Sequence, residues 1–176
     1  MIKKYFYNGK EYLSDYQVRQ AIFETERIAF PEEPKENKAK FWNDLGVTYI
    51  EEETPLETLK TQKLNLLDMT FMRWRNNDAT LVSSLGFTAD CDERAMIDVN
   101  GLVTICTDTV TFMDANNNPH ELTIEQLKVL QAEIIQSGTL AYQTKWMLRQ
   151  AIETAQNKEA LDAIEIKFEP VSFEVM

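Results

Sequence analysis

The sequence predicts an α+β protein, in which a small hairpin–helix–strand module precedes a helix-rich domain that contains a β-hairpin. Aromatic strand formers flank an Asn8-Gly9 dipeptide near the N-terminus, which is typical of a two-residue hairpin turn. Apolar residues recur at helical spacing after about residue 55, and an asparagine-rich turn interrupts them near 115. A hydrophobic fraction of 44% in 176 residues is enough to build a core.

The first module is expected to span 1–53. A hairpin over 2–13 is followed by Ser14, which is well suited to cap a helix over 15–29 that carries Ile28 on its apolar face. The remaining predicted features are the helix break at Phe30-Pro31, a helix over 35–45 capped by Gly46, a strand over 47–50 and an acidic, proline-containing boundary at 51–55.

The second domain is expected to span 54–176. Its predicted elements are a helix over 55–76 capped by Thr54, extended residues 79–90, a helix that starts at Asp92, a hairpin over 110–122, a helix that starts at Thr123 and ends at Ser137-Gly138, a helix over 139–156, a short helix that starts at Asn157, and an extended strand over 166–175. Two sets of residues compete for the buried stripe of the helix over 139–156: Tyr142, Trp146, Arg149 and Ile152, or Leu148, Ile152 and Ala155.

The charge of the chain points to protein partners. Its 29 acidic and 18 basic residues give a formal net charge of −11, with no run of Lys or Arg. Nucleic acids and anionic membranes attract basic surfaces, so neither is an expected partner. No apolar stretch approaches the roughly 20 residues of a membrane-spanning helix, and no signal peptide is evident, so the chain is expected to act in the cytoplasm.

Few residues suggest catalytic or metal chemistry. Cys91 and Cys106 lie in apolar surroundings and are expected to be reduced thiols. Asp114, Asn116, Asn118 and Glu125 match positions of a calcium loop, but Pro119 occupies the position that needs glycine. The same residues are ordinary hairpin-turn formers, so no metal or cofactor is predicted.

Two further patterns are candidate enzyme sites. Asp90, Asp92 and Asp98 are a candidate metal-dependent hydrolase cluster, although helix capping explains Asp92 directly. His120 is the chain's single histidine, and its place after Pro119 predicts an exposed turn residue. No catalytic residue is therefore assigned.

Aromatic residues supply the candidate partner contacts. Trp74, Tyr142 and Trp146 are accompanied by arginines, and such groups anchor many protein interfaces, although packing in the core is the alternative. The strand over 166–175, with Phe168 and Phe173, is suited to extend the sheet edge of a partner.

Several short motifs carry a family resemblance: Leu85-Gly86-Phe87-Thr88-Ala89-Asp90, Asp98-Val99-Asn100-Gly101-Leu102, Val110-Thr111-Phe112-Met113-Asp114, His120-Glu121-Leu122-Thr123 and the helical block 124–164. Because of these motifs, the segment from about residue 60 to residue 176 resembles a domain of unknown function found in bacteriophage and prophage tail fibre and tail-assembly proteins. The resemblance supplies no catalytic residue and no cofactor.

The resemblance implies a non-enzymatic structural protein of a phage tail, or a chaperone or adaptor in tail fibre assembly. Its expected partner is a phage tail or tail fibre protein, or a second copy of itself, in the host cytoplasm during assembly or in the virion tail. A small acidic phage-encoded inhibitor of a host protein is the alternative, and a metal-dependent hydrolase is the third hypothesis.

Overall fold

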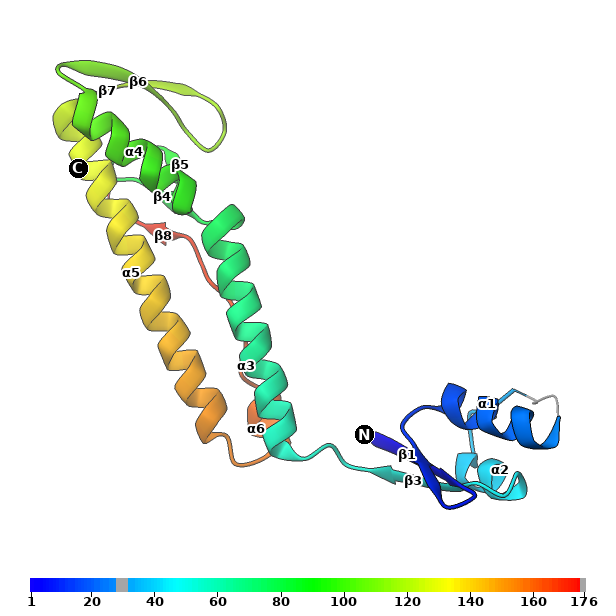
Figure 1. Ribbon diagram of the computed structural model, residues 1–176. Helices are drawn as coiled ribbons and strands as arrows, with labels where there is room; N and C mark the ends of the chain where they lie inside the picture. The colour runs from blue at the N-terminus through cyan, green and yellow to red at the C-terminus, as the bar shows by residue number, and fades with distance from the viewer. Residues whose placement is uncertain (28–31, 175–176) are drawn as a thin grey trace. The chain divides into compact units, whose positions relative to one another are not determined.

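The computed structural model describes residues 1–27 and 32–174, and the chain divides into two compact units, Met1–Pro55 and Leu56–Met176. The predicted α+β class is confirmed, since small sheets accompany helices in both units (Figure 1). None of the helices among the described residues is long and apolar enough to cross a membrane.

The first unit is a three-stranded antiparallel sheet, in the order β2-β1-β3, with two helices. Its elements are β1 (Ile2–Tyr7), β2 (Lys10–Tyr12), α1 (Asp15–Glu26), α2 (Lys38–Asp44) and β3 (Thr48–Glu52). The predicted hairpin is confirmed: Tyr5 pairs with Tyr12, and Asn8 and Gly9 both take positive φ angles, of 50° and 75°. Its core consists of Tyr5, Tyr7, Val18, Ile22, Trp42 and Val47.

Three boundaries of this unit differ from the prediction. The helix predicted over 35–45 begins only at Lys38, because Asn37 adopts the left-handed conformation. α1 ends at Glu26 because Arg27 adopts the left-handed conformation, while Ile28 and the break at Phe30-Pro31 lie outside the described residues. β3 continues into the acidic run, since Glu52 pairs with Lys4 of β1 through an ion pair of 2.8 Å. The opposite charge across the strand makes the extension favourable.

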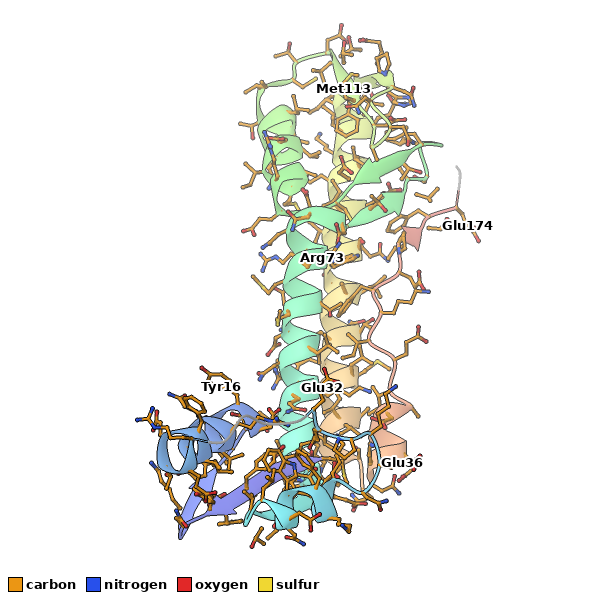
Figure 2. The ribbon with its side chains drawn as sticks, turned by 90° about the vertical axis from the view of Figure 1, so that its right-hand side faces the viewer. Tyr16, Glu32, Glu36, Arg73, Met113 and Glu174 are labelled. Carbon is orange, nitrogen blue, oxygen red and sulfur yellow. The ribbon has the colours of Figure 1, made fainter. Side chains whose placement is uncertain are left out.

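The second unit is built around two long antiparallel helices, α3 and α5 (Figure 1). Its elements are α3 (Leu56–Arg73), the π-helix η1 (Trp74–Asp78), β4 (Thr80–Val82), β5 (Thr88–Asp90), α4 (Glu93–Ile105), β6 (Thr109–Met113), β7 (Pro119–Thr123), α5 (Ile124–Thr154), α6 (Lys158–Asp162) and β8 (Val171–Ser172). Figure 2 shows Met113 at the hairpin end of this unit and Arg73 partway along it, where α3 ends.

The helix end predicted at Ser137-Gly138 was wrong, because α5 is one continuous helix of 31 residues. Its start is as predicted, with a capping box between Thr123 and Gln126. Glycine costs a helix interior only about 1 kcal/mol. Burial of the helix against α3 and α4 outweighs this, and Ser137 itself is fully buried.

The far end of α5 settles which stripe is buried. Ile152 and Ala155 are buried and Leu148 packs against them, whereas Tyr142 and Trp146 are 43% and 61% exposed. The second of the two predicted stripes is therefore the packed one.

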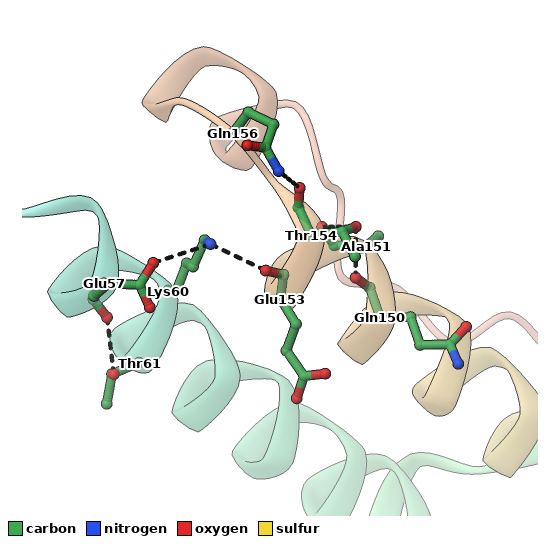
Figure 3. Close-up of polar contacts among 8 residues, drawn as sticks. All are labelled: Glu57, Lys60, Thr61, Gln150, Ala151, Glu153, Thr154 and Gln156. Atoms are coloured by element: carbon green, nitrogen blue, oxygen red, sulfur yellow. Dashed lines mark hydrogen bonds and ion pairs between the residues drawn. The ribbon is translucent and has the colours of Figure 1, made fainter.

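The start of α3 lies beside the ends of α5 and α6. The predicted cap at Thr54 was wrong, since the hydroxyl of Thr54 accepts a hydrogen bond from the Met1 ammonium and α3 begins at Leu56. Two lysines of α3 contact the ends of the neighbouring helices. Lys60 Nζ donates to the carbonyl oxygen of Glu153 in the last turn of α5 (Figure 3), and Lys63 Nζ donates to the carbonyl oxygen of Leu161 in α6. Lysine ammonium groups thus donate to carbonyl oxygens at two helix C-termini, and the Leu161 carbonyl also accepts from the Ile164 N–H at 3.3 Å.

The extended strand predicted over 166–175 is mostly irregular. Only Val171–Ser172 forms a strand, β8, which pairs in parallel with β4 of the same chain, and Val175 lies outside the described residues. We call residues 164–174 the strap. They run back along the unit from α6 to the sheet of β4 and β5, where Glu174 lies (Figure 2).

Candidate functional site

An apolar groove opens where η1, α4 and α5 meet. The cavity has a volume of about 360 Å³ and is called the aromatic groove. Its lining comprises Phe71, Trp74, Arg75, Cys91, Asp92, Glu93, Met96, Ile97, Ile134, Ile135, Gly138, Thr139 and Tyr142. Several lining side chains remain open to solvent, with Ile97 at 65% and Ile135 at 52% exposure, so the groove is an unusually apolar part of the surface.

One wall of the groove is an aromatic–arginine cluster. The Tyr142 ring packs edge-on against Phe71, with 4.9 Å between centroids, and the Arg75 guanidinium donates to the Tyr142 hydroxyl at 2.9 Å. Arg75 also lies 3.6 Å from the Glu93 carboxylate. The π-helix positions this wall, because η1 contains both Trp74 and Arg75. Such turns occur often at functional sites.

A line of charge continues the groove along α3 and α5. Asp68 pairs with Lys145 at 2.7 Å and with Arg149 at 3.2 Å. The hydrogen bond from Lys145 holds the pKa of the Asp68 carboxyl below its ordinary value. Arg149 lies 5.8 Å from the ring of Trp146, which is one turn beyond Tyr142. Trp146 is 61% exposed, so much of its indole remains open as a contact surface beside this guanidinium.

The middle of α5 lacks the acidity of the rest of the chain. Residues 134–152 include Lys145 and Arg149 but no Asp or Glu, in a chain with a net charge of −11. This is the part of α5 that carries Ile135, Tyr142 and Trp146. The α5 side of the groove is therefore apolar and free of acids, while Asp92 and Glu93 lie on its α4 side, and such a face is well suited to contact another protein.

The base of the groove contains a thiol that is a poor nucleophile. Cys91 is buried, and its Sγ lies 3.6 Å from the hydroxyl of Ser137. Burial raises the pKa of the Cys91 thiol, so the reactive thiolate is disfavoured at neutral pH. Both cysteines are free, as predicted.

The five predicted partner-contact residues fall into two groups. Tyr142 lines the aromatic groove and Trp146 follows it, both exposed, whereas Trp74 is 8% exposed and contributes one buried wall. Phe168 and Phe173 lie on the strap, where both pack against the core of their own unit.

The asparagine-rich segment is a hairpin turn, as predicted. Asp114 Oδ1 accepts hydrogen bonds from the backbone N–H groups of Asn116 and Asn118, each at 2.8 Å. These backbone donors, that of Asn118 foremost, hold the pKa of Asp114 well below its ordinary value.

The predicted exposure of His120 was wrong. The residue lies in β7, its side chain is 31% exposed, and it stacks on Phe87 with 4.2 Å between ring centroids. Its Nε2 lies 3.1 Å from Asp114 Oδ2. The pair fixes the two ends of the hairpin turn to each other.

The three acids of the hydrolase hypothesis do not converge on one site. Asp92 Oδ1 accepts a hydrogen bond from Ala95 N–H at 2.7 Å and caps α4, and Asp98 is exposed on that helix. Desolvation raises the pKa of the Asp90 carboxyl, and the nearby Asp92 carboxylate raises it further. Within residues 1–27 and 32–174, no group of three or more His, Cys, Asp or Glu is placed to hold a metal ion.

A buried polar network supports the groove from behind. Glu133 of α5 is 6% exposed, and it accepts hydrogen bonds from the Ser83 hydroxyl at 2.6 Å and the Ser84 N–H at 3.0 Å. It fixes the loop between β4 and β5 to α5. Sequence reasoning missed this network and the groove residues of α4, since both depend on contacts far apart in the chain.

The fold and the groove define a helix-rich α+β protein with an aromatic surface site. Residues 61–165 match the family model described as a domain of unknown function (DUF4376), and the chain belongs to this family. The match includes every residue that lines the aromatic groove. No curated protein and no solved structure matches the chain.

Proposed function

We propose that the chain is a non-enzymatic protein-recognition module of a bacteriophage or prophage tail, either a structural component or a chaperone or adaptor in tail fibre assembly. The observation that carries the recognition role is the aromatic groove, with Arg75 and Tyr142 joined at 2.9 Å and Trp146 exposed beside them. Trp, Tyr and Arg dominate the binding energy of protein interfaces. The tail context rests on the resemblance carried by residues of about 60–176.

The partner proposed for the groove is a tail or tail fibre protein, met in the host cytoplasm during assembly or in the finished tail. The acid-free middle of α5 supports a protein partner, because it lowers the electrostatic cost of bringing a second surface to an acidic chain. An interface centred on the rings of Tyr142 and Trp146 and the guanidinium of Arg75 needs no catalytic group.

Mass spectrometry of purified phage particles beside the whole-cell lysate tests the tail context. Enrichment of the chain in particles supports a virion component, and its presence in lysate together with a bound tail protein supports an assembly factor. Capture of a host protein and no tail protein would overturn the tail context in favour of an inhibitor.

Groove variants test the recognition role in the same lysates. Tyr142→Ala and Trp146→Ala are expected to lose the captured tail protein, since a central aromatic anchor contributes about 2 kcal/mol or more. Met147→Ala is the matched control, because Met147 is 70% exposed on the same helix and does not line the groove. Equal loss in all three variants would contradict a role for the groove.

A further inference from the structure

The strap lies against fully buried parts of the second unit. The ring of Phe168 packs 5.4 Å from that of Phe71 and 5.8 Å from that of Trp74. Val171 pairs with Leu81 of β4, and the Phe173 N–H donates to the Val82 carbonyl at 2.9 Å. The strap therefore covers an elongated apolar surface formed by α3, α5 and β4.

The strap itself is only half buried. Its residues alternate between partly buried and exposed from Ile164 to Glu169 and again from Pro170 to Glu174, with Glu169 and Pro170 both exposed, and no strap residue reaches full burial. Pro170, which has no N–H to donate, immediately precedes β8. Among the described residues, its only ion pair is internal, between Lys167 and Glu169. A cavity of about 170 Å³ also remains between the strap and α5, lined in part by Leu140 and Thr144.

The anchoring of the chain changes sharply just before the strap. Leu161 of α6 is 2% exposed, and Lys63 Nζ donates to its carbonyl oxygen. A short helix fixed by a buried side chain and a lysine is thus followed by a segment held by two ladder residues and by apolar side chains that are all only partly buried: Ile164, Ile166, Phe168 and Phe173. Local opening is expected to occur in the less protected segment, with α6 as its fixed end.

We propose that the strap is exchangeable, and that the surface beneath it accepts the same segment from a second copy of the chain, so that two copies are joined by swapped straps. The occupant follows from fit: the alternating side chains of Ile164–Glu174 already match this surface. An exchanged strap restores every contact of the closed form, so concentration decides between monomer and swapped dimer.

A labelled peptide with the sequence of residues 164–174 tests the proposal on the full chain. Its fluorescence anisotropy should rise on mixing, and the rate should level off with peptide concentration because release of the resident strap becomes limiting. A peptide with Phe168→Ala should bind at least about tenfold more weakly, since it lacks the main anchor. A peptide with Lys167→Ala should bind like the unaltered peptide, because Lys167 is 62% exposed.

Two differently tagged full-length chains test the second copy as occupant. After incubation at high concentration they should co-purify as a dimer, and Phe168→Ala in both chains should speed this exchange, with Glu169→Ala as the matched control. No peptide uptake, or equal uptake of the Phe168→Ala peptide, would overturn the exchangeable strap. Peptide uptake without exchange between tagged chains would overturn the second copy as the occupant.

Discussion

Lys60 Nζ lies 3.0 Å from the carbonyl oxygen of Glu153, so a side chain near the start of α3 closes the end of α5 (Figure 3). The lysine is 13% exposed and lies 3.1 Å from the Glu57 carboxylate. A cation at this position is favoured both by the unpaired carbonyl and by the partial negative charge of the helix C-terminus.

Lys60→Met should therefore loosen the end of α5. The variant keeps the aliphatic stem but removes the donor to an exposed carbonyl, and the expected loss of unfolding free energy is about 0.5–1 kcal/mol. Faster hydrogen exchange of backbone amides near the end of α5, in residues 150–155, would report it. Lys128→Met is the control, because its side chain is 52% exposed and pairs only with exposed Glu125, and it should leave those amides unchanged.

Gly138→Ala should make the protein more stable while impairing the groove. Both Gly138 and Gly101 are helical, and an added Cβ would meet no atom within 4 Å at either position. Each substitution to alanine should raise the free energy of unfolding by about 0.5–1 kcal/mol in urea titrations.

The two glycine variants should differ in binding. Gly138 lines the aromatic groove and Gly101 does not, so only Gly138→Ala should weaken capture of the partner proposed above. If both variants bind like the unaltered chain, a partner does not use this part of the groove.

Acid should destabilise the hairpin of β6 and β7 through Asp114. The folded pKa of this carboxyl lies below its unfolded value of about 3.9, so its stabilising effect is complete above that value and declines as pH falls below it. Thermal unfolding between about pH 4 and pH 2 should show a smaller loss of stability in Asp114→Asn than in the unaltered chain. Asp98→Asn, which removes an exposed carboxylate, should lose as much thermal stability at low pH as the unaltered chain. If both variants lost stability equally, Asp114 would not be the source of the acid sensitivity.

The two thiols should react at different rates. Cys91 is 8% exposed and burial raises its pKa, whereas Cys106 is only partly buried. With a thiol-reactive disulfide reagent, the Cys106→Ser variant should react at least about tenfold more slowly than the Cys91→Ser variant. As a control, the two variants should react at similar rates in denaturant. If they also reacted at similar rates when folded, the base of the groove would open readily.

Local chemistry in the sequence predicted much of the fold. Asn8-Gly9, Asp92 and Thr123 each act on a backbone within four residues, and the turn and caps expected from them are present. Gly138 was misread because its surroundings come from other elements: the burial of α5 against α3 and α4 is invisible in a window of sequence.

The candidate site was predictable only in part. Trp74, Tyr142 and Trp146 stood out by residue type, but which of them faces solvent depends on packing between α3 and α5. His120 was misplaced for a similar reason, since Phe87, the ring beneath it, lies far away in the chain. The spacing of Ile135, Thr139, Tyr142 and Trp146, at alternating steps of four and three, was an available signal for one continuous helix face.

The position of Phe71 links the two surfaces of the second unit. Its ring touches Tyr142 of the aromatic groove, at 4.9 Å, and Phe168 of the strap, at 5.4 Å. Thermodynamic coupling is reciprocal, so a ligand that binds more tightly when Phe168 packs on Phe71 must also lower the equilibrium population of chains with an open strap. One phenylalanine would then let occupancy of the groove decide how readily the chain enters strap exchange.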